Sequence, residues 1–435
     1  MNEKKKKIGF KLILLSLFLL TGLQVLLIVW CNSNYLIRFP FLIIICILIA
    51  ALVCLLILGL KWFFKNRKAN KKIIKKWVKI LFSVFMTVYI IGCIIFALLL
   101  YGPNDRFKNW LITTAMQTMN HQYYCKWFYS EEDINEVLAN NYVQESGEST
   151  DTSLIEKVEY KYRKDSYENE YEKQILDVDD DIKYQIIKLN VNGCNGYLAV
   201  IYDPSKVKLA VTQNLGTKGQ YVTTMADNHN ALLGINGGGF SDPGNNSAGG
   251  TPTGITIQDG KIVTNGEYGT NNQSGGIIGF TNEDVLVLLK NTTAQEALNM
   301  GVRDAISWGP FLIVNGTPSF IRGNGGWGYA ARSAIGQRAD GIVLLLVIDS
   351  NATRTKGADM VDLAEIMQNY GAINAANLDG GTSSVMVMPK EIAQKDYNAP
   401  CSDYRNETYC AINDPIDGDL KHQTRPIADA WVVVE

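Results

Sequence analysis

The chain has 435 residues, with 41 Lys and Arg against 43 Asp and Glu, so its formal net charge is only −2. That length exceeds what one ordinary domain needs. The charge is unevenly divided: residues 1–103 hold 15 of the basic residues and one acid, which leaves 26 basic and 42 acidic residues elsewhere. A basic N-terminal part before an acidic remainder argues against nucleic acid as a ligand.

Three apolar runs without a charge lie in the basic part, at about 12–30, 41–60 and 80–101. Each has the ~20 residues that cross a ~30 Å hydrocarbon core. None shows the polar face of a soluble helix. We therefore predict that residues 1–103 are a membrane anchor of three transmembrane helices, with the lipid bilayer as a partner.

Lysines cluster before the first run and, with one Arg, in residues 61–79 between the second and third runs. Basic residues concentrate on the cytoplasmic side of a membrane, so both segments are expected there. Three spans then place everything after Gly102 outside the cytoplasm. The predicted location is the cell membrane, multi-pass, with an extracytoplasmic C-terminal domain.

Residues 104–181 are predicted to form a membrane-proximal helical stalk and a linker. Asp105–Tyr124 is amphipathic, and a second helix begins at Ser130, an N-cap candidate with Asp133 three positions on. The polar, charged stretch from Gln144 to Asp181 has little aliphatic content and indicates a linker or a weakly structured connection.

Residues 182–435 alternate short apolar strands with turn residues and contain few helices. The strand Gly341–Ile348 ends in Asp349, and a largely apolar helix at Met360–Tyr370 precedes the strand Ala375–Leu378. Without regular βαβ alternation, this pattern predicts an α+β domain with a mixed β-sheet core and packed helices.

Asp379 is the single acid of the run Gly371–Met386, GAINAANLDGGTSSVM. Burying an unpaired carboxylate costs several kcal/mol, which a site tolerates better than a scaffold does. The two glycines let the backbone turn sharply and leave room for a ligand, and three hydroxyls follow. A plain Asp-Gly turn is the simpler interpretation of the same residues.

Cys401 and Cys410 flank a polar loop and could form a disulfide, which is permitted outside the cytoplasm, although sequence does not fix the pairing. With no CxxC pair and three His, a zinc site is not expected. A divalent cation is left open, without EF-hand spacing, because hard oxygen ligands are present. These candidate ligands are Asp242, Asn245, Asn246, Asp349 and Asp379.

Seven blocks in a fixed order resemble a known family. They read INGGGF (235–240), GITIQDGKI (254–262), GPFLIVNG (309–316), ARSAIGQRADG (331–341), VIDS (347–350), GADMVDLAEIMQNYGAINAANLDGGTSS (357–384) and TRPIADAWVV (424–433). Residues 182–435 thus resemble the phosphodiester glycosidase family, the domain type of the mannose-6-phosphate uncovering enzyme, an N-acetylglucosamine-1-phosphodiester alpha-N-acetylglucosaminidase. Bacterial exopolysaccharide-associated proteins carry it too, and the chain is identified as a membrane member of that kind.

The resemblance implies hydrolysis of a sugar-1-phosphate diester at the glycosidic carbon, with a carbohydrate phosphodiester as substrate. Family positions carry over to Asn236, Arg332, Asp349, Asn377, Asp379, Ser383 and Ser384. Two departures are that Ser241 intervenes before Asp242, which puts the role of Asp242 in doubt, and that Thr382 replaces a frequent glycine.

Two carboxylates near the scissile bond are the usual glycosidase arrangement. Asp379 is the first candidate for base or nucleophile, and Asp349 is the second, with a strand-end turn cap as the alternative for Asp349. Arg332 and Arg425 have guanidinium forks that match phosphate oxygens, although most Arg side chains are simply solvated. The predicted substrate-binding residues are Asn236, Gly237, Gly238, Arg332, Asn377, Gly380, Gly381, Thr382, Ser383, Ser384 and Arg425.

Gly237–Gly239 could present backbone N–H groups to phosphate as a nest. Trp327, in a glycine-rich loop, could stack on a sugar or be a packed turn aromatic. The predicted function is a membrane-anchored extracytoplasmic phosphodiester glycosidase that acts on envelope or exopolysaccharide glycans. The alternatives are a non-catalytic glycan-binding or exopolysaccharide-assembly protein, which would not need a buried acid, and a membrane scaffold.

Overall fold

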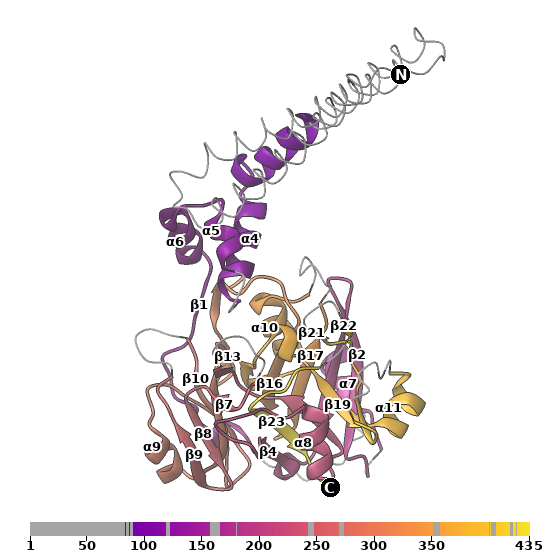
Figure 1. The fold of residues 1–435 in the computed structure, drawn as a ribbon. Coiled ribbons are helices and arrows are strands. Elements are labelled where there is room, and N and C mark those ends of the chain that lie inside the picture. The colour runs from indigo at the N-terminus through magenta and orange to yellow at the C-terminus, as the bar shows by residue number, and fades with distance from the viewer. Residues whose placement is uncertain are drawn as a thin grey trace, which may run out of the picture. The chain divides into compact units, whose positions relative to one another are not determined.

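The structure is a computed structural model that describes residues 83, 87, 90–118, 122–156, 166–179, 181–241, 248–268, 274–350, 357–399, 401, 406–417, 421–422 and 424–435. The chain divides into two compact units, Met1–Leu138 and Ala139–Glu435 (Figure 1). The boundaries expected at 103 and 181 stay predictions.

The described part of the first unit is helical. A helix over residues 90–101 is followed by α4 (Arg106–Met116), α5 (Tyr123–Lys126) and α6 (Glu131–Ala139). A small apolar cluster, which includes Ile112 and Ile134, holds this part together. The predicted N-cap of α6 is confirmed, because Ser130 Oγ accepts a hydrogen bond from Asp133 N at 3.1 Å and an Asp133 oxygen accepts one from Ser130 N at 3.2 Å.

The predicted transmembrane helices are not confirmed. The first two lie outside the described residues, and the third is described continuously only from Ile90 to Tyr101, with residues 83 and 87 before it. Among the described residues, no single helix has the length and apolar composition of a membrane span. The one candidate is a bent pair, Ile90–Tyr101 with Arg106–Met116, whose axes differ by 70°.

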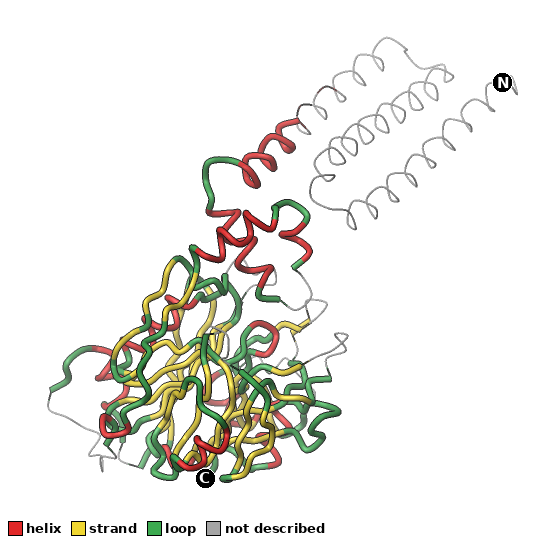
Figure 2. The backbone as a smooth tube through the Cα atoms, turned by 90° about the vertical axis from the view of Figure 1, so that its left-hand side faces the viewer, coloured by secondary structure: helices red, strands yellow, loops and turns green. Residues whose placement is uncertain are grey.

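Within its described residues, the second unit contains three large β-sheets (Figures 1 and 2). The first has seven strands in the order β14 (Thr317–Pro318), β13 (Phe311–Val314), β18 (Ala372–Asn377), β16 (Arg332–Arg338), β17 (Val343–Ile348), β3 (Cys194–Ile201) and β2 (Tyr184–Val191). The second has five, in the order β20 (Tyr409–Ala411), β19 (Met386–Pro389), β5 (Leu233–Asn236), β23 (Asp429–Val433) and β4 (Val207–Val211). The third also has five, in the order β11 (Leu286–Leu289), β10 (Gly276–Thr281), β12 (Val302–Trp308), β8 (Ile255–Gln258) and β9 (Lys261–Asn265).

Short elements complete the unit. The two-stranded pairs are β1 (Tyr142–Gln144) with β15 (Phe320–Arg322), β6 (Phe240–Ser241) with β7 (Thr251–Pro252), and β21 (Ile416–Asp417) with β22 (Lys421–His422). The helices are α7 (Glu170–Leu176), α8 (Val222–Asn228), α9 (Ala294–Asn299), α10 (Met360–Asn369) and α11 (Lys390–Tyr397), with 3₁₀ turns η1 (Thr152–Leu154), η2 (Pro204–Lys206) and η3 (Gly381–Ser383).

One central core joins the three sheets. It contains Leu345 of β17, Trp431 of β23 and Phe280 of β10, and the last two rings meet edge to face at 5.5 Å. Other apolar clusters hold helices against sheet residues: α10 and α7 with the first sheet, α8 with the second and α9 with the third. Fully burying each large apolar side chain contributes about 1.5–3 kcal/mol.

The α+β prediction is confirmed. The predicted strand Gly341–Ile348 agrees with β17 to within two residues, and the predicted helix Met360–Tyr370 agrees with α10 to within one residue. A mixed sheet was expected, but all the described strand pairs are antiparallel. Antiparallel strands need only short connections, which fits the absence of βαβ alternation in the sequence.

The expected linker over residues 144–181 is instead part of the folded unit wherever it is described. Glu145 accepts hydrogen bonds from the backbone N–H groups of Gly275 and Phe311, both at 2.7 Å, and its other oxygen lies 2.5 Å from Lys290 Nζ. Farther on, α7 buries Ile175 and Leu176 completely. The polar composition misled the prediction, because a buried carboxylate that accepts two backbone hydrogen bonds and pairs with Lys290, together with two aliphatic residues, fixes this segment.

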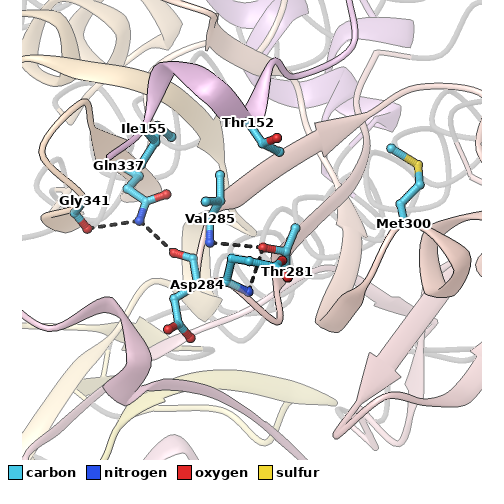
Figure 3. A pocket seen from close by; sticks show the side chains of 9 residues that line it. Thr152, Ile155, Thr281, Asp284, Val285, Met300, Gln337 and Gly341 are labelled. Atoms are coloured by element: carbon cyan, nitrogen blue, oxygen red, sulfur yellow. Dashed lines mark hydrogen bonds between the residues drawn. The ribbon is translucent and has the colours of Figure 1, made fainter. Parts of the chain in front are cut away.

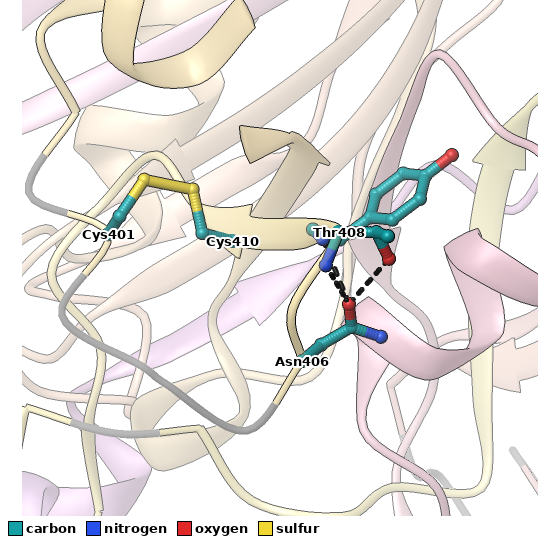
Figure 4. Close-up of a disulfide and its surroundings, with 5 residues drawn as sticks. Cys401, Asn406, Thr408 and Cys410 are labelled. Atoms are coloured by element: carbon teal, nitrogen blue, oxygen red, sulfur yellow. Dashed lines mark hydrogen bonds between the residues drawn. A yellow bond between two sulfur atoms is a disulfide. The ribbon is translucent and has the colours of Figure 1, made fainter. Parts of the chain in front are cut away.

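The predicted closeness of Cys401 and Cys410 is confirmed. Their Cα atoms are 5.1 Å apart and their sulfurs are bonded, as Figure 4 shows. Beside the disulfide, Asn406 Oδ1 accepts hydrogen bonds from the N–H and hydroxyl groups of Thr408 at 2.8 and 2.7 Å. Cys410 lies in β20, so the bridge fixes the edge strand of the second sheet.

Candidate functional site

The pairing of strands in the first sheet brings the predicted acids and Arg332 to one edge. Because β16 is antiparallel to both β17 and β18, its first residue lies where those two strands end. Arg332 pairs with Ile348, directly before Asp349, and Ala334 pairs with Asn377, two residues before Asp379. Residues distant in sequence therefore converge there.

Asp379 is held by a turn from the second sheet. Its N–H donates to Gly237 O at 3.0 Å, and its own carbonyl accepts from Asn236 Nδ2 at 2.7 Å. One carboxylate oxygen accepts from Gly380 N at 2.9 Å. The residue as a whole stays partly exposed.

Burial raises the pKa of Asp379, while a hydrogen bond from Ser383 and the positive charges of Arg425 and Arg332 act in the opposite direction. A desolvated carboxylate near cations has the character of a functional group rather than of a surface turn. The 3₁₀ turn η3 follows directly, and Gly381 adopts φ +65° there, which favours glycine.

Arg332 is a buried cation held by carbonyl oxygens. Its side chain donates to Ala358 O at 3.2 Å, Trp327 O at 2.5 Å and Gly328 O at 2.8 Å. The guanidinium carbon also lies 5.8 Å from the centre of the Trp327 ring. Such a fixed cation next to Asp379 fits the expected phosphate-binding role.

Arg425 approaches the same turn from the chain just before β23. Its Nη1 donates to Thr382 Oγ1 at 3.0 Å, and its guanidinium carbon lies 4.7 Å from the centre of the Phe240 ring. It is half-buried. Arg332 and Arg425 are therefore both close enough to influence Asp379 electrostatically.

The glycine turn 237–239 does not act as an open nest. The N–H groups of Gly237 and Gly238 donate to the carbonyl and the carboxyl of Asp429, at 3.1 and 2.7 Å. Both N–H groups are thus paired within the protein and are not available to a phosphate. The turn instead holds Asp379 in place. At Gly239 a Cβ atom would collide with the ring of Trp308, so only glycine fits.

Asp349 is buried at the same sheet edge. Its Oδ1 accepts from Asn413 Nδ2 at 2.9 Å and from Asp414 N at 3.0 Å, whereas Oδ2 is buried without a hydrogen bond. Burial raises its pKa to about 6. Asn413 also donates to Ser384 O at 3.2 Å, which links Asp349 to the residues after Asp379.

The other predicted residues have mainly structural contacts. Asn236 is fully buried, and its Oδ1 accepts from Ser333 Oγ and Val385 N at 2.6 and 3.1 Å. Asn377 donates to Gly309 O at 2.8 Å. Ser383 and Ser384 are also buried, while Gly380, Gly381 and Thr382 keep some exposure. Direct contact of these residues with substrate stays a prediction.

Three aromatic rings form a contiguous group, and one of them, Tyr268, is close enough to Asp379 to be influenced by its charge. Tyr268 stacks on Trp308 with ring centres 5.7 Å apart, and Trp308 meets Trp327 edge to face at 6.4 Å. Burial, then the negative charges of Glu145 and Asp379, raise the pKa of Tyr268. Sequence reasoning had named only Trp327 of these three. All three keep some exposure, so they could offer an apolar face to a sugar ring.

No cluster of three or more His, Cys, Asp or Glu side chains within the described residues is arranged to hold a metal ion. Of the candidate ligands, Asp242, Asn245 and Asn246 lie outside those residues.

A separate cavity of about 380 Å³ lies elsewhere in the unit (Figure 3). It is bounded by Thr152, Val285, Met300 and Gln337, among others. The Gln337 amide donates to Asp284 O and Gly341 O, at 2.9 and 3.0 Å, so the polar group that borders the cavity is satisfied within the protein. None of the residues around Asp379 borders it.

Residues 229–434 match the family model described as phosphodiester glycosidase. Among curated proteins, the chain is 25% identical over 173 residues to the SPbeta prophage-derived uncharacterized protein YomE of Bacillus subtilis (strain 168). This match covers 39% of the chain and 26% of YomE, so the chain spans about a quarter of that relative's length.

Three solved structures are similar at low identity. The catalytic domain of zebrafish N-acetylglucosamine-1-phosphodiester alpha-N-acetylglucosaminidase, auto-inhibited by its pro-peptide, is 19% identical, with 58% of this chain and 82% of that one covered and a TM-score of 0.42. A putative exported protein from Burkholderia pseudomallei K96243 is 16% identical, with 56% and 74% covered and a TM-score of 0.37. A hypothetical protein from Synechocystis is 15% identical, with 57% and 61% covered and a TM-score of 0.35.

The residues gathered around Asp379 all lie within 229–434, and over that range this chain is similar to the phosphodiester glycosidases.

Proposed function

We propose that this chain is a membrane-anchored phosphodiester glycosidase that hydrolyses a sugar-1-phosphate diester of envelope or exopolysaccharide glycans outside the cytoplasm. The observation that carries the proposal is the meeting of a desolvated, partly exposed Asp379 with Arg332 and Arg425. The match of residues 229–434 to the phosphodiester glycosidase family supports the same chemistry.

Each residue has a separate role in the proposed hydrolysis. A water molecule forms a bond to the anomeric carbon as the bond from that carbon to the phosphate oxygen breaks, and the electron pair leaves with the phosphomonoester. Asp379, as base, takes the proton of the water. Arg332 and Arg425 stabilise the negative charge that develops on the phosphate. A phosphate is a good leaving group, so a strong general acid is not required.

Asp349 is the second carboxylate of the proposal. It lies at the same edge and is linked to the Asp379 turn through Asn413 and Ser384. Its raised pKa fits a carboxyl that accepts and releases a proton near neutral pH. The aromatic group Tyr268, Trp308 and Trp327 would face the sugar.

The test is incubation of the full-length protein, kept in mild detergent, with glycosyl 1-(methyl phosphate) diesters that differ in the sugar. The expected products are free sugar and methyl phosphate. In oxygen-18-labelled water the label must be absent from methyl phosphate, because a glycosidase breaks the bond on the carbon side. Label in the phosphate would show a phosphodiesterase, and binding without turnover would support the non-catalytic glycan-binding alternative.

A further inference from the structure

We propose that Asp429, which sequence reasoning did not single out, is a positioning residue for Asp379, and that the two side chains work as one coupled carboxyl pair across the Gly237–Gly238 peptide. The inference deepens the proposed site, and it rests on the proposed function only for its kinetic test.

One peptide group joins the two acids. The Gly237–Gly238 peptide accepts the Asp379 N–H through its carbonyl, at 3.0 Å, and donates its N–H to Asp429 Oδ1, at 2.7 Å. Because donor and acceptor belong to one rigid, planar group, a movement of Asp429 tilts the group that fixes the main chain of Asp379. Hydrogen bonds in such a chain also polarise one another.

The packing leaves the Asp429 side chain little freedom. It is 1% exposed, and its carbonyl accepts the Gly237 N–H at 3.1 Å, so the turn is bonded to both ends of this residue. A Cβ atom on Gly237 would collide with Asp429 Oδ1. The glycine is thus what permits the carboxyl to approach the peptide.

The charges around Asp429 make the coupling electrostatic as well. Burial raises the pKa of Asp429 to about 7, and the negative charge of Asp379 acts in the same direction. Asp379 itself faces Arg425 and Arg332. The cross-strand neighbours in the sheet bring no charge: Asp429 pairs with Val211 of β4, and the adjacent Ala430 pairs with Asn236 of β5.

Two acids that are joined by one peptide group and interact through their charges lose their protons in two steps that belong to the pair. The first step leaves one negative charge, which the two arginines favour on Asp379. The second step ionises Asp429 near neutral pH and places a second charge beside an anionic phosphodiester. Activity should therefore fall on the alkaline side as Asp429 ionises.

The experiment compares pH–rate profiles, from pH 5 to 9, of the full-length wild type and Asp429→Asn on the glycosyl 1-(methyl phosphate) diester that turns over best. The variant keeps an oxygen for the Gly238 N–H bond and loses the ionisable group. We expect its rate at the optimum to stay within about tenfold of the wild type. Removing a general base costs at least ~100-fold, so this loss would be smaller. We expect the acid limb to remain and the alkaline limb near pH 7 to disappear.

The matched control is Asp304→Asn in β12. Asp304 is also 1% exposed, accepts one backbone N–H (Asp259, 3.0 Å) and has a pKa raised by burial; unlike Asp429 it also pairs with Arg303. It should keep the wild-type profile. An alkaline limb that survives unchanged in Asp429→Asn, or that moves equally in the control, overturns the proposal while leaving the proposed function intact.

A second measurement needs neither activity nor the Asp429 variant. The thermal midpoint of the full-length protein should fall as the pH rises toward the Asp429 pKa of about 7 and should level off above it. In Asp379→Asn the fall should level off at lower pH and be smaller in total, because the neighbouring charge that raises the Asp429 pKa has gone. An unchanged midpoint–pH curve in Asp379→Asn refutes the coupling, even if no substrate is found or Asp429→Asn does not fold.

Discussion

At the scale of single residues, Asp379 combines two properties. Its backbone is fixed by hydrogen bonds to Asn236 and Gly237, while its carboxyl is desolvated within reach of the charges of two arginines. A plain turn residue would need the first property but not the second. The functional interpretation therefore fits the surroundings of Asp379 better than the Asp-Gly hairpin turn does.

Asp379→Asn tests this interpretation directly. The substitution keeps the volume and an oxygen for the Gly380 N–H, but removes the base, so hydrolysis should fall by at least ~100-fold. Substrate binding should weaken much less, because Arg332 and Arg425 remain. The measurements are kcat, KM and the unfolding midpoint of the purified protein. Near-normal turnover contradicts the assignment, and an unfolded variant would mean that Asp379 is structural.

Sequence identified Asp379 and Arg332 because each belongs to a recognisable block. It did not identify Asp429 or Asn413. Both act through contacts between segments far apart in the sequence, Asp429 on Gly238 and Asn413 on Asp349, and such contacts depend on strand pairing that no local pattern encodes. Their only sequence signal is a polar residue beside apolar strand residues, which a turn would also produce.

At the scale of elements, the site is built from strand ends. The first sheet supplies Arg332, Asp349 and Asp379, and the second supplies the glycine turn and Asp429. The sequence predicted the strand Gly341–Ile348 closely, but β12, β16 and β19 were not predicted. β12 and β16 in particular carry buried polar residues such as Asp304 and Ser333, so their apolar pattern is interrupted.

The disulfide is an element-scale feature with a measurable contribution. Replacing both Cys401 and Cys410 with Ser removes a closure of about ten residues, which the chain-entropy relation values at roughly 2–3 kcal/mol of unfolding free energy. Denaturant titrations of the double variant and of reduced wild type should give the same loss. Equal stability of the oxidised wild type and the variant would show that the bridge does not support β20.

At the scale of the whole molecule, several buried carboxyls make the folded state less stable as the pH rises. Burial raises the pKa of Asp349 and Asp359 to about 6 and that of Asp429 to about 7. An unfolded Asp has a pKa near 3.9, so the folded state binds more protons. The stability contributed by these groups is fully present below about pH 4 and is lost as the pH rises to about 7.

Each such group should lower the free energy of unfolding by about 1.4 kcal/mol per pH unit while it titrates. Urea titrations of the full-length protein between pH 5 and 8 measure the slope. Asp429→Asn should make the fall with pH shallower. A stability that rises steadily over this range would contradict the raised pKa values.

Topology is the other prediction for the whole molecule. The lysine asymmetry predicts that the C-terminal unit lies outside the cytoplasm. Protease added to intact cells should therefore digest residues 104–435 while a cytoplasmic marker stays protected. Protection of both would show that the predicted orientation is wrong.

The packing of residues 139–156 determines at which residue an expressed fragment should begin. Thr150 Oγ1 accepts a hydrogen bond from Leu288 N of β11 at 2.8 Å, and Glu145 binds two more backbone N–H groups. A fragment starting at residue 182 would leave all three donors without these partners and would expose the edge of the third sheet to aggregation. A recombinant fragment should begin at Ala139, even though the residues that resemble a glycosidase start much later.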